Sequence, residues 1–552
     1  MSGIFGIGSS ALLTYQRALS VTGHNIANAG NENYSRQRLE LAVRNPQFSG
    51  AGWFGQGVQM TDVARIADQF VLAQLRDNTS GFGRQQVYHQ YAKRADNLLA
   101  DPQSGLAPVL NQFFAAVQDV SNDPTSIPAR QVLLSQGQAL ADRFAFLHKG
   151  LDDQRRLLEG QVGAAVQDVN TLAQGIASLN RQIVDATGIG GGKAPNDLLD
   201  QRDELIGRLS ELVTVQTLPQ DDGSVNVLIG SGQSLVVGPH ASTLAAQALG
   251  NDPTRMEIAI VSPGSTIRVT ELITGGQLGG LLEVRRDILD PAQNALGLTA
   301  VGLAMAFNEL HANGVDLDGL AGGEFFRVPA AGVVVGRGNS AAGQPAVSFT
   351  DAGALTGRDY RLSFDGSEWR LSRIGTPGVL ATAAPGETIS FDGLEIDLSG
   401  ITGEATGDSF DLQPTRNAAA GLGMALSDPR GFAAALPPDD PASNVAGDNR
   451  NALALAGLAS QGVLAGGNTS ISASYSQLVA DVGVKTRQAE LSFQAQGRLL
   501  DESRAMRESI SGVNLDEEAA NLLRYQQAYA AAAQVIAVAG TMFDTLLMAV
   551  RR

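Results

Sequence analysis

The chain has no cysteine among its 552 residues. Disulfide bonds and thiolate metal sites are therefore both excluded. Basic residues are also scarce, with 39 Lys and Arg against 56 Asp and Glu. Nucleic acids and anionic membrane surfaces both favour basic patches, so this balance argues against either as a partner. A chain of this length exceeds what one hydrophobic core can support and predicts roughly three or four domains.

Long apolar runs and targeting signals are missing as well. The most apolar stretch, residues 530–540, is interrupted by Gln534 and falls short of the roughly 20 residues that span a bilayer. The N-terminus has no basic segment followed by an apolar segment and a small-residue cleavage site, so we expect no secretory signal peptide. Composition by itself would place the chain in the cytoplasm.

The sequence also lacks motifs for catalysis or ligand binding. Its five histidines are scattered without metal-ligand spacing, and we expect capping or surface contacts for them. The glycine-rich segments at Gly188 and Gly230 lack key positions of a phosphate loop and of a dinucleotide fingerprint, and DLDGLAGG at Asp316 lacks the later ligands of a calcium loop. No GxSxG elbow occurs. We therefore expect no enzyme activity, no metal and no cofactor, and interpret these segments as loops and turns.

What the sequence does contain is a long, regular helical pattern at its end. Within residues 514–552 large side chains recur every seven positions, which predicts one helix with a continuous apolar seam. Asn514 is a favourable N-cap, and Glu517 is placed for a capping box. At 1.5 Å per residue this helix would be about 55 Å long, so its seam needs a partner helix from elsewhere. The large side chains of the seam are Leu515, Leu522, Tyr525, Tyr529, Ile536, Phe543, Leu546 and Val550, and Ala532 and Ala539 share the heptad position of Tyr525 and Leu546.

A second seam lies near the beginning of the chain. Residues 10–29 place Leu12, Leu19 and Ile26 seven apart, with Tyr15, Thr22 and Ala29 three residues after each, and Gly30 is a natural residue to follow the helix end. We expect the two terminal helices to pair with each other. The alternative is that each seam packs on the core of its own domain.

Between the termini the periodicity changes several times. Heptad patterns predict helices over 151–185 and 279–313, and a further long helix is expected over 470–511. Period-two alternation predicts hairpins after residue 213 and again in DYRLSFDGSEWRLS, which turns at Asp365–Gly366. The prolines of residues 436–450 predict a linker.

These patterns predict an α+β multidomain fold. Long coiled-coil-like helices from both termini pair into a rod-like core, and mainly-β domains are inserted in the middle of the chain. We divide it into a terminal coiled coil (1–33 with 514–552), a mainly helical rod (34–212 with 275–324 and 450–513), a small β region (213–274) and an outer mainly-β domain (325–440).

Particular segments resemble the axial proteins of the bacterial flagellum, which include the rod, hook and hook-associated proteins. The N-terminal match is ALSVTGHNIANAG followed by NYSRQR, and residues 511–547 resemble the C-terminus of the hook-associated members. Further matches to those members, in order along most of the chain, are APNDLLDQRDELI, LGGLLEVRRDIL, FNELHANGVDLDG and NRNALALAGL.

The resemblance implies a structural, self-assembling subunit at the junction between hook and filament. It implies export through the flagellum's own type III channel, without a cleaved signal peptide. The implied partners are further copies of the chain, the hook protein, hook-associated protein 3, and a flagellar export chaperone that binds the C-terminal helix. We expect the seam residues named above to form the assembly interface. The alternatives are another axial protein, such as the hook protein, and a secreted coiled-coil binding module.

Overall fold

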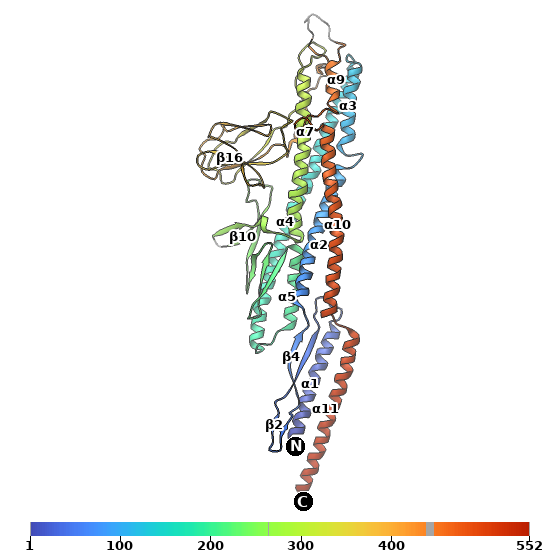
Figure 1. Cartoon of the computed structure of the whole chain (residues 1–552), viewed down its shortest axis with the longest axis vertical. Helices are drawn as coiled ribbons and strands as arrows, with labels where there is room; N and C mark the ends of the chain where they lie inside the picture. Colours follow the sequence, from blue (N-terminus) through green and yellow to red (C-terminus); the bar gives the residue numbers. More distant parts are fainter. Residues whose placement is uncertain (1, 263, 438–445, 551–552) are drawn as a thin grey trace.

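The computed structural model describes residues 2–262, 264–437 and 446–550. The molecule is elongated, with helices along its long axis, both termini at one end and β regions on one side (Figure 1). The α+β prediction, with long terminal helices and a mainly-β middle, is confirmed. We propose the same four-part division of the chain as before.

The rod is a bundle in which α10 runs along α2, and α4 packs against α3 and α5. The sequence predicted a break before residue 151, but α4 is continuous over 63 residues. Gly150 lies inside this helix, at a point where α2 packs closely against it. An added Cβ there would lie 2.7 Å from the Leu98 side chain of α2. This glycine serves close helix packing and does not end the helix. The rod helices are α2 (Gln69–Leu99), α3 (Leu106–Asn122), α4 (Ile127–Ile189), α5 (Asn196–Leu212), α9 (Arg450–Gly457) and α10 (Ile471–Ser511).

The helix expected over 279–313 contains an irregular turn. It consists of α6 (Gly276–Val284), a five-residue π-helical turn (Arg285–Leu289) and α7 (Asp290–Ala312). A π turn inserts one extra residue per turn and rotates the side chains that follow it. It places Asp290 at the start of α7, beside the β regions.

The smaller β region packs on α4 through two antiparallel sheets. Its first hairpin turns at Asp222–Gly223, as the sequence predicts. One sheet contains β5 (Val215–Pro219), β6 (Val225–Ile229), β7 (Gln233–Val237) and β8 (His240–Ala241). The other contains β9 (Thr243–Gln247), β10 (Glu257–Ser262) and β11 (Ser265–Arg268), followed by η1 (Thr270–Leu272).

The outer β domain has its own hydrophobic core. The predicted hairpin at Asp365–Gly366 is confirmed, with Phe364 opposite Trp369, and Trp369 is fully buried. A five-stranded sheet has the order β13 (Gly332–Val335), β20 (Ser409–Gln413), β15 (Tyr360–Phe364), β16 (Trp369–Arg373), β17 (Val379–Ala383). A three-stranded sheet has the order β14 (Ala346–Phe349), β19 (Leu394–Asp397), β18 (Thr388–Phe391).

Short elements connect this domain to the rod. β12 (Phe326–Arg327) pairs with β21 (Gly423–Met424), and α8 (Ala418–Gly421) packs on α7 and α4. η3 (Pro429–Gly431) follows. Residues 438–445 of the predicted linker lie outside the described residues.

The terminal part consists of two helices and a hairpin. α1 (Ser2–Ala27) lies along α11 (Leu515–Val550), and β1 (Gln37–Val43) pairs with β4 (Val58–Arg65). Between these strands the chain forms a small second hairpin from β2 (Gln47–Phe48) and β3 (Trp53–Phe54).

Candidate assembly surface

The first and last helices pack against each other in antiparallel order. Tyr15 of α1 lies beside Tyr525 of α11, with 6.4 Å between the ring centroids. Nearer the N-terminus Ile536 covers Gly8, where an added Cβ would lie 2.6 Å from the Ile536 Cγ1 atom. The prediction that the two termini pair is therefore confirmed.

The side chains at the centre of this contact include the small positions of the predicted seams, Thr22, Ala532 and Ala539. The buried ones are Thr14, Ala18, Thr22, Asn25, Glu518, Ala532 and Ala539. The half-buried seam residues are Leu12, Tyr15, Leu19, Ile26, Leu522, Tyr525 and Ile536. The exposed seam residues are Leu515, Tyr529, Phe543, Leu546 and Val550. Within one chain the small seam positions and their neighbours therefore form the contact, because small residues let the two backbones approach, and the large seam residues stay half-buried or exposed. That the seam residues contact neighbouring copies stays a prediction.

The end of α11 is apolar and uncovered. Residues 541–550 are all exposed, because α11 continues past the first turn of α1 (Figure 1). Contiguous exposed apolar surface of this kind marks interaction sites in soluble proteins. The large side chains that it presents are Met542, Phe543, Leu546, Leu547, Met548 and Val550.

This helix also meets a simple criterion for a membrane span. An 18-residue window within Ile471–Val550 has a mean hydropathy of 1.6, and 6% of that window is buried. By length and composition, one helix is therefore long and apolar enough to cross a membrane, whereas the sequence was expected to contain no such stretch. The criterion is weak evidence, since a helix that is apolar all round also suits burial among neighbouring helices.

A largely buried polar cluster with an exposed edge at Glu517, which we call the joint, connects the terminal helix pair to the rod. The Oδ1 of Asn25 accepts hydrogen bonds from the Tyr34 hydroxyl (2.6 Å) and the Gln37 amide (3.0 Å). Its Nδ2 donates to the Gln37 carbonyl (2.9 Å) and to Glu518 (3.2 Å). These bonds fix the end of α1 against β1 and α11. The joint consists of Asn25, Tyr34, Arg36, Gln37, Glu517 and Glu518.

The acidic first turn of α11 belongs to the joint. Asn514 caps the helix as predicted, because its Oδ1 accepts hydrogen bonds from the amides of Asp516 and Glu517. The Glu517 carboxylate, however, accepts from Arg36 Nη1 at 2.6 Å, and Glu518 accepts from Arg36 Nε at 2.8 Å. The interpretation of these acids by capping alone was therefore incomplete. Only the fold reveals that Arg36, the first arginine of NYSRQR, reaches Glu517 and Glu518.

Helix α5 supports the joint from the rod side. Asp200 accepts a hydrogen bond from the Ser35 amide at 3.0 Å and pairs with Arg65 at 2.8 Å. Burial, with nearby carboxylates that include Asp200, raises the pKa of Tyr34 well above its ordinary value. The Tyr34 hydroxyl therefore stays protonated and can donate to Asn25 across the usual pH range.

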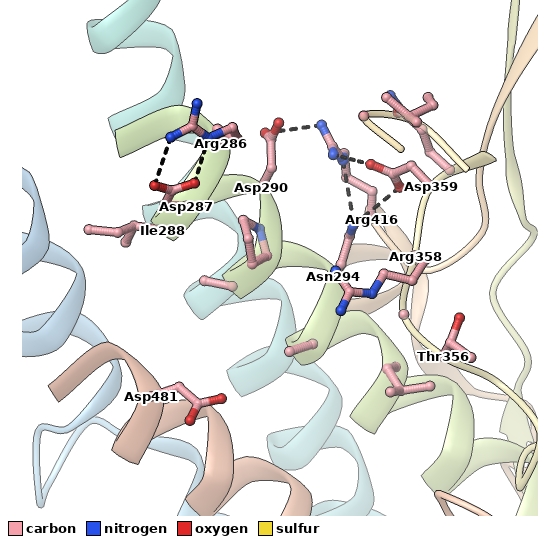
Figure 2. Close-up of a pocket in the computed structure, with 18 of the residues that line it drawn as sticks. Arg286, Asp287, Ile288, Asp290, Asn294, Thr356, Arg358, Asp359, Arg416 and Asp481 are labelled. Carbon is pink, nitrogen blue, oxygen red and sulfur yellow. Dashed lines mark hydrogen bonds and ion pairs between the residues drawn. The ribbon is translucent and has the colours of Figure 1, made fainter. Parts of the chain in front are cut away.

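A second charged cluster, which we call the domain lock, lies where the β regions meet the rod. Arg416 Nη1 lies 3.1 Å from Asp290 Oδ1, and the same guanidinium bonds Asp359 (Figure 2). Asp290 also accepts a hydrogen bond from Arg255 at 3.0 Å, and Arg155 lies 3.8 Å away. The domain lock consists of Arg155, Arg255, Asp290, Asp359 and Arg416, and connects α4, β10, α7 and the outer domain.

Arg255, Asp290, Asp359 and Arg416 of the domain lock line a cleft of about 1770 Å³. Burial alone would raise the pKa of Asp290, but Arg416, Arg255 and Arg155 together lower it below its ordinary value. The carboxylate therefore stays ionised and holds the arginines. Other charges of the wall pair with each other, such as Arg286 with Asp287 at 2.7 Å. Through the described ranges, no group of three His, Asp or Glu side chains could hold a metal ion.

Histidine has a different role from the one expected. His311 is buried; its Nδ1 lies 2.7 Å from the Gly323 carbonyl, and its Nε2 accepts from the Ala433 amide at 3.0 Å. His148 is buried too. The expectation of capping or surface contacts is therefore wrong for these two. Asp316 forms a turn, as predicted, since its carboxylate accepts hydrogen bonds from amides that follow it.

Three family models match the chain. Residues 92–326 match the helical domain of the flagellar hook-associated protein FlgK, and residues 336–414 match the D2-like domain of flagellar hook-associated protein 1. Residues 492–548 match the C-terminal region of the flagellar basal body rod proteins FlgEFG.

Individual proteins match over nearly the whole length. The chain is 36% identical to flagellar hook-associated protein 1 of Escherichia coli (strain K12), over 99% of this chain and 100% of the other. It is 28% identical to the protein of that name from Bacillus subtilis (strain 168), over 97% and 96%. The solved structure of the flagellar hook junction protein FlgK from Burkholderia pseudomallei superimposes with a TM-score of 0.72 at 26% identity, over 80% of this chain and 100% of that chain.

Proposed function

The chain belongs to the flagellar hook-associated protein 1 family, and from this premise we propose how it performs its structural role at the junction between hook and filament. It is a component of the extracellular, axial part of the bacterial flagellum. Its copies assemble side by side through their terminal helices. The interface is formed by the seam residues of α1 and α11, and no catalytic step takes part.

The observation that carries this proposal is the uncovered apolar surface of α11. Burying a large apolar side chain contributes roughly 1.5–3 kcal/mol. Small residues such as Ala18 and Ala532 lie buried at the contact of α11 with α1. A single copy therefore gains little of the free energy that burial of the large side chains would contribute. Neighbouring copies that cover Phe543, Leu546 and Val550 would supply the remaining burial free energy. Ordering of the termini would accompany assembly.

We further propose the neighbours and the route of export. The hook protein contacts the assembled ring of copies on one side, and hook-associated protein 3 contacts it on the other. The chain leaves the cell unfolded through the flagellar type III channel. The absence of cysteine suits this route, since no disulfide could form and obstruct passage.

Deletion of the gene tests the junction role. Cells without the chain are expected to carry hooks without filaments and to release filament protein into the medium, because the filament has no surface on which to begin. Electron microscopy of the cells and immunoblotting of the medium measure both effects. Restoring the wild-type chain serves as the control, and filaments of normal number and length in the deletion strain would contradict the proposal.

Chaperone binding tests the state of the C-terminal helix before export. Removing residues 515–552 is expected to abolish binding of the flagellar export chaperone, because the apolar surface of α11 would be its binding site. Removing residues 2–33 is the matched control and should leave binding unchanged. Isothermal titration of the purified proteins measures both, and undiminished affinity after the C-terminal deletion would rule this site out.

A further inference from the structure

The tip of the β2–β3 hairpin presents an uncovered aromatic cluster. Trp53 is 71% exposed, and Phe48 and Phe54 are more than half exposed. The rings of Phe48 and Trp53 lie 5.5 Å apart, so they form one surface. Residues 45–56 contain no charged side chain. Adjacent exposed aromatics of this kind are typical of the anchors of protein interfaces.

The hairpin is held against the terminal helices. The β1–β4 ladder packs on α1, and an added Cβ at Gly57 would lie 2.4 Å from Ser10 Oγ and 3.2 Å from Ile7 Cα. The positive φ of Gly57 (90°) and this close approach set where the tip emerges. The aromatic tip is therefore presented at a fixed place beside the N-terminal half of α1.

A complementary surface lies on α11 at the same end of the molecule. The stripe that contacts α1 includes Ala532 and Ala539, and the same heptad position recurs at Leu546, beyond the end of α1. Phe543 lies three residues before Leu546 and Val550 lies four residues after it, so both share its face. This stripe continues an existing helix contact into a region that the chain itself leaves open.

The positions and charges of the two surfaces fit two different copies. In Figure 1 the hairpin lies on one flank of α1, and α11 lies on the other. A ring of identical copies brings unlike flanks together, which is a heterologous contact. Arg44 is the lone charge beside the tip, Asp544 is the lone charge of residues 525–550, and in the described chain neither forms an ion pair.

We propose that the β2–β3 tip of one copy docks on residues 541–550 of α11 in a neighbouring copy, with Arg44 beside Asp544. This rests on the proposed function, because it takes the neighbour to be a second copy in the flagellar assembly. Each copy would contact one neighbour through its tip and the other neighbour through the end of its α11, so the contacts would follow one direction around the ring. It would cover both the aromatic tip and the end of α11.

Cysteine cross-linking tests the contact, since the natural chain has no cysteine to interfere. Trp53→Cys is combined in turn with Met542→Cys, Phe543→Cys and Met548→Cys, which point in different directions around α11. Flagella from cells that produce each double variant are treated with mild oxidant or with a flexible bis-maleimide, and the chain is detected by immunoblotting. Each single variant, and Trp53→Cys with the distant, exposed Leu320→Cys, are the controls.

The contact predicts a ladder of dimers, trimers and larger species in at least one double variant. The single variants should give dimers at most, because each copy then carries one reactive position. Variants that are present in flagella but give no ladder with any of the three pairs would overturn the proposal, as would a cross-link confined to the monomer. Absence of the wild-type chain from purified flagella would count against the proposed function instead.

Discussion

Bacteria whose only copy of the chain carries Ile536→Asp are expected to assemble hooks but almost no filaments. Ile536 covers Gly8 in the α1–α11 contact. A carboxylate at this position would lose its hydration among apolar groups, which costs several kcal/mol. The cost recurs in every copy of the assembly. Leu522→Asp, which changes another half-buried seam residue, should have the same effect.

Electron microscopy of the cells, with immunoblotting of purified flagella, measures this loss of incorporation. Ile189→Asp is the matched control, since Ile189 is 90% exposed at the end of α4 and takes no part in the contact of α1 with α11. Circular dichroism should show that all the purified variants retain the folded rod and β domains. Normal filaments on cells with Ile536→Asp would show that the terminal helices do not form the interface.

Removing the carboxylate of the domain lock by Asp290→Ala should destabilise the free protein by roughly 3–5 kcal/mol, as is typical when one partner of a buried ion pair is lost. Three arginines would lose their common counter-charge: Arg416 and Arg155, which are buried, and the partly exposed Arg255. The outer β domain should separate from the rod at a lower denaturant concentration. Tryptophan fluorescence follows this domain because Trp369 lies in its core.

The matched control for this variant is Asp318→Ala. Asp318 pairs with Arg430 on an exposed surface, where solvent screens the charges, so little change is expected. The double variant Asp290→Ala with Arg416→Ala should recover part of the loss, since one uncompensated charge is then removed. Equal unfolding midpoints for Asp290→Ala and Asp318→Ala would contradict the locking role.

Local patterns were enough to predict much of the fold. The hairpin at Asp365–Gly366 follows from alternating residues and a turn dipeptide, both of which lie within a few residues of each other. Gly150 shows where such reasoning fails, because its effect depends on Leu98 in another helix. The π turn at Arg285–Leu289 is likewise set by its surroundings, and a heptad pattern continues through it without a signal.

The candidate site was predicted in part. Heptad spacing located both terminal helices and the buried seam positions Thr22, Ala532 and Ala539, but the large side chains predicted for the interface are half-buried or exposed in the single chain. Spacing cannot distinguish a stripe that faces the chain's own helix from one that faces a neighbour. The joint was missed because Asn25 and Glu518 are far apart in the sequence and meet only in the folded chain.

Hydrogen exchange of the free subunit and of purified flagella tests the central claim most directly, which is that neighbouring copies supply the cover for the terminal helices. In dilute monomer, residues 2–33 and 515–552 should exchange nearly as fast as an unfolded peptide, while residues 360–373 of the outer domain stay protected. In flagella the terminal residues should slow by about a hundredfold or more, or roughly 2.8 kcal/mol at 1.4 kcal/mol per factor of ten. Equally slow exchange of both terminal segments in the dilute monomer would contradict the claim.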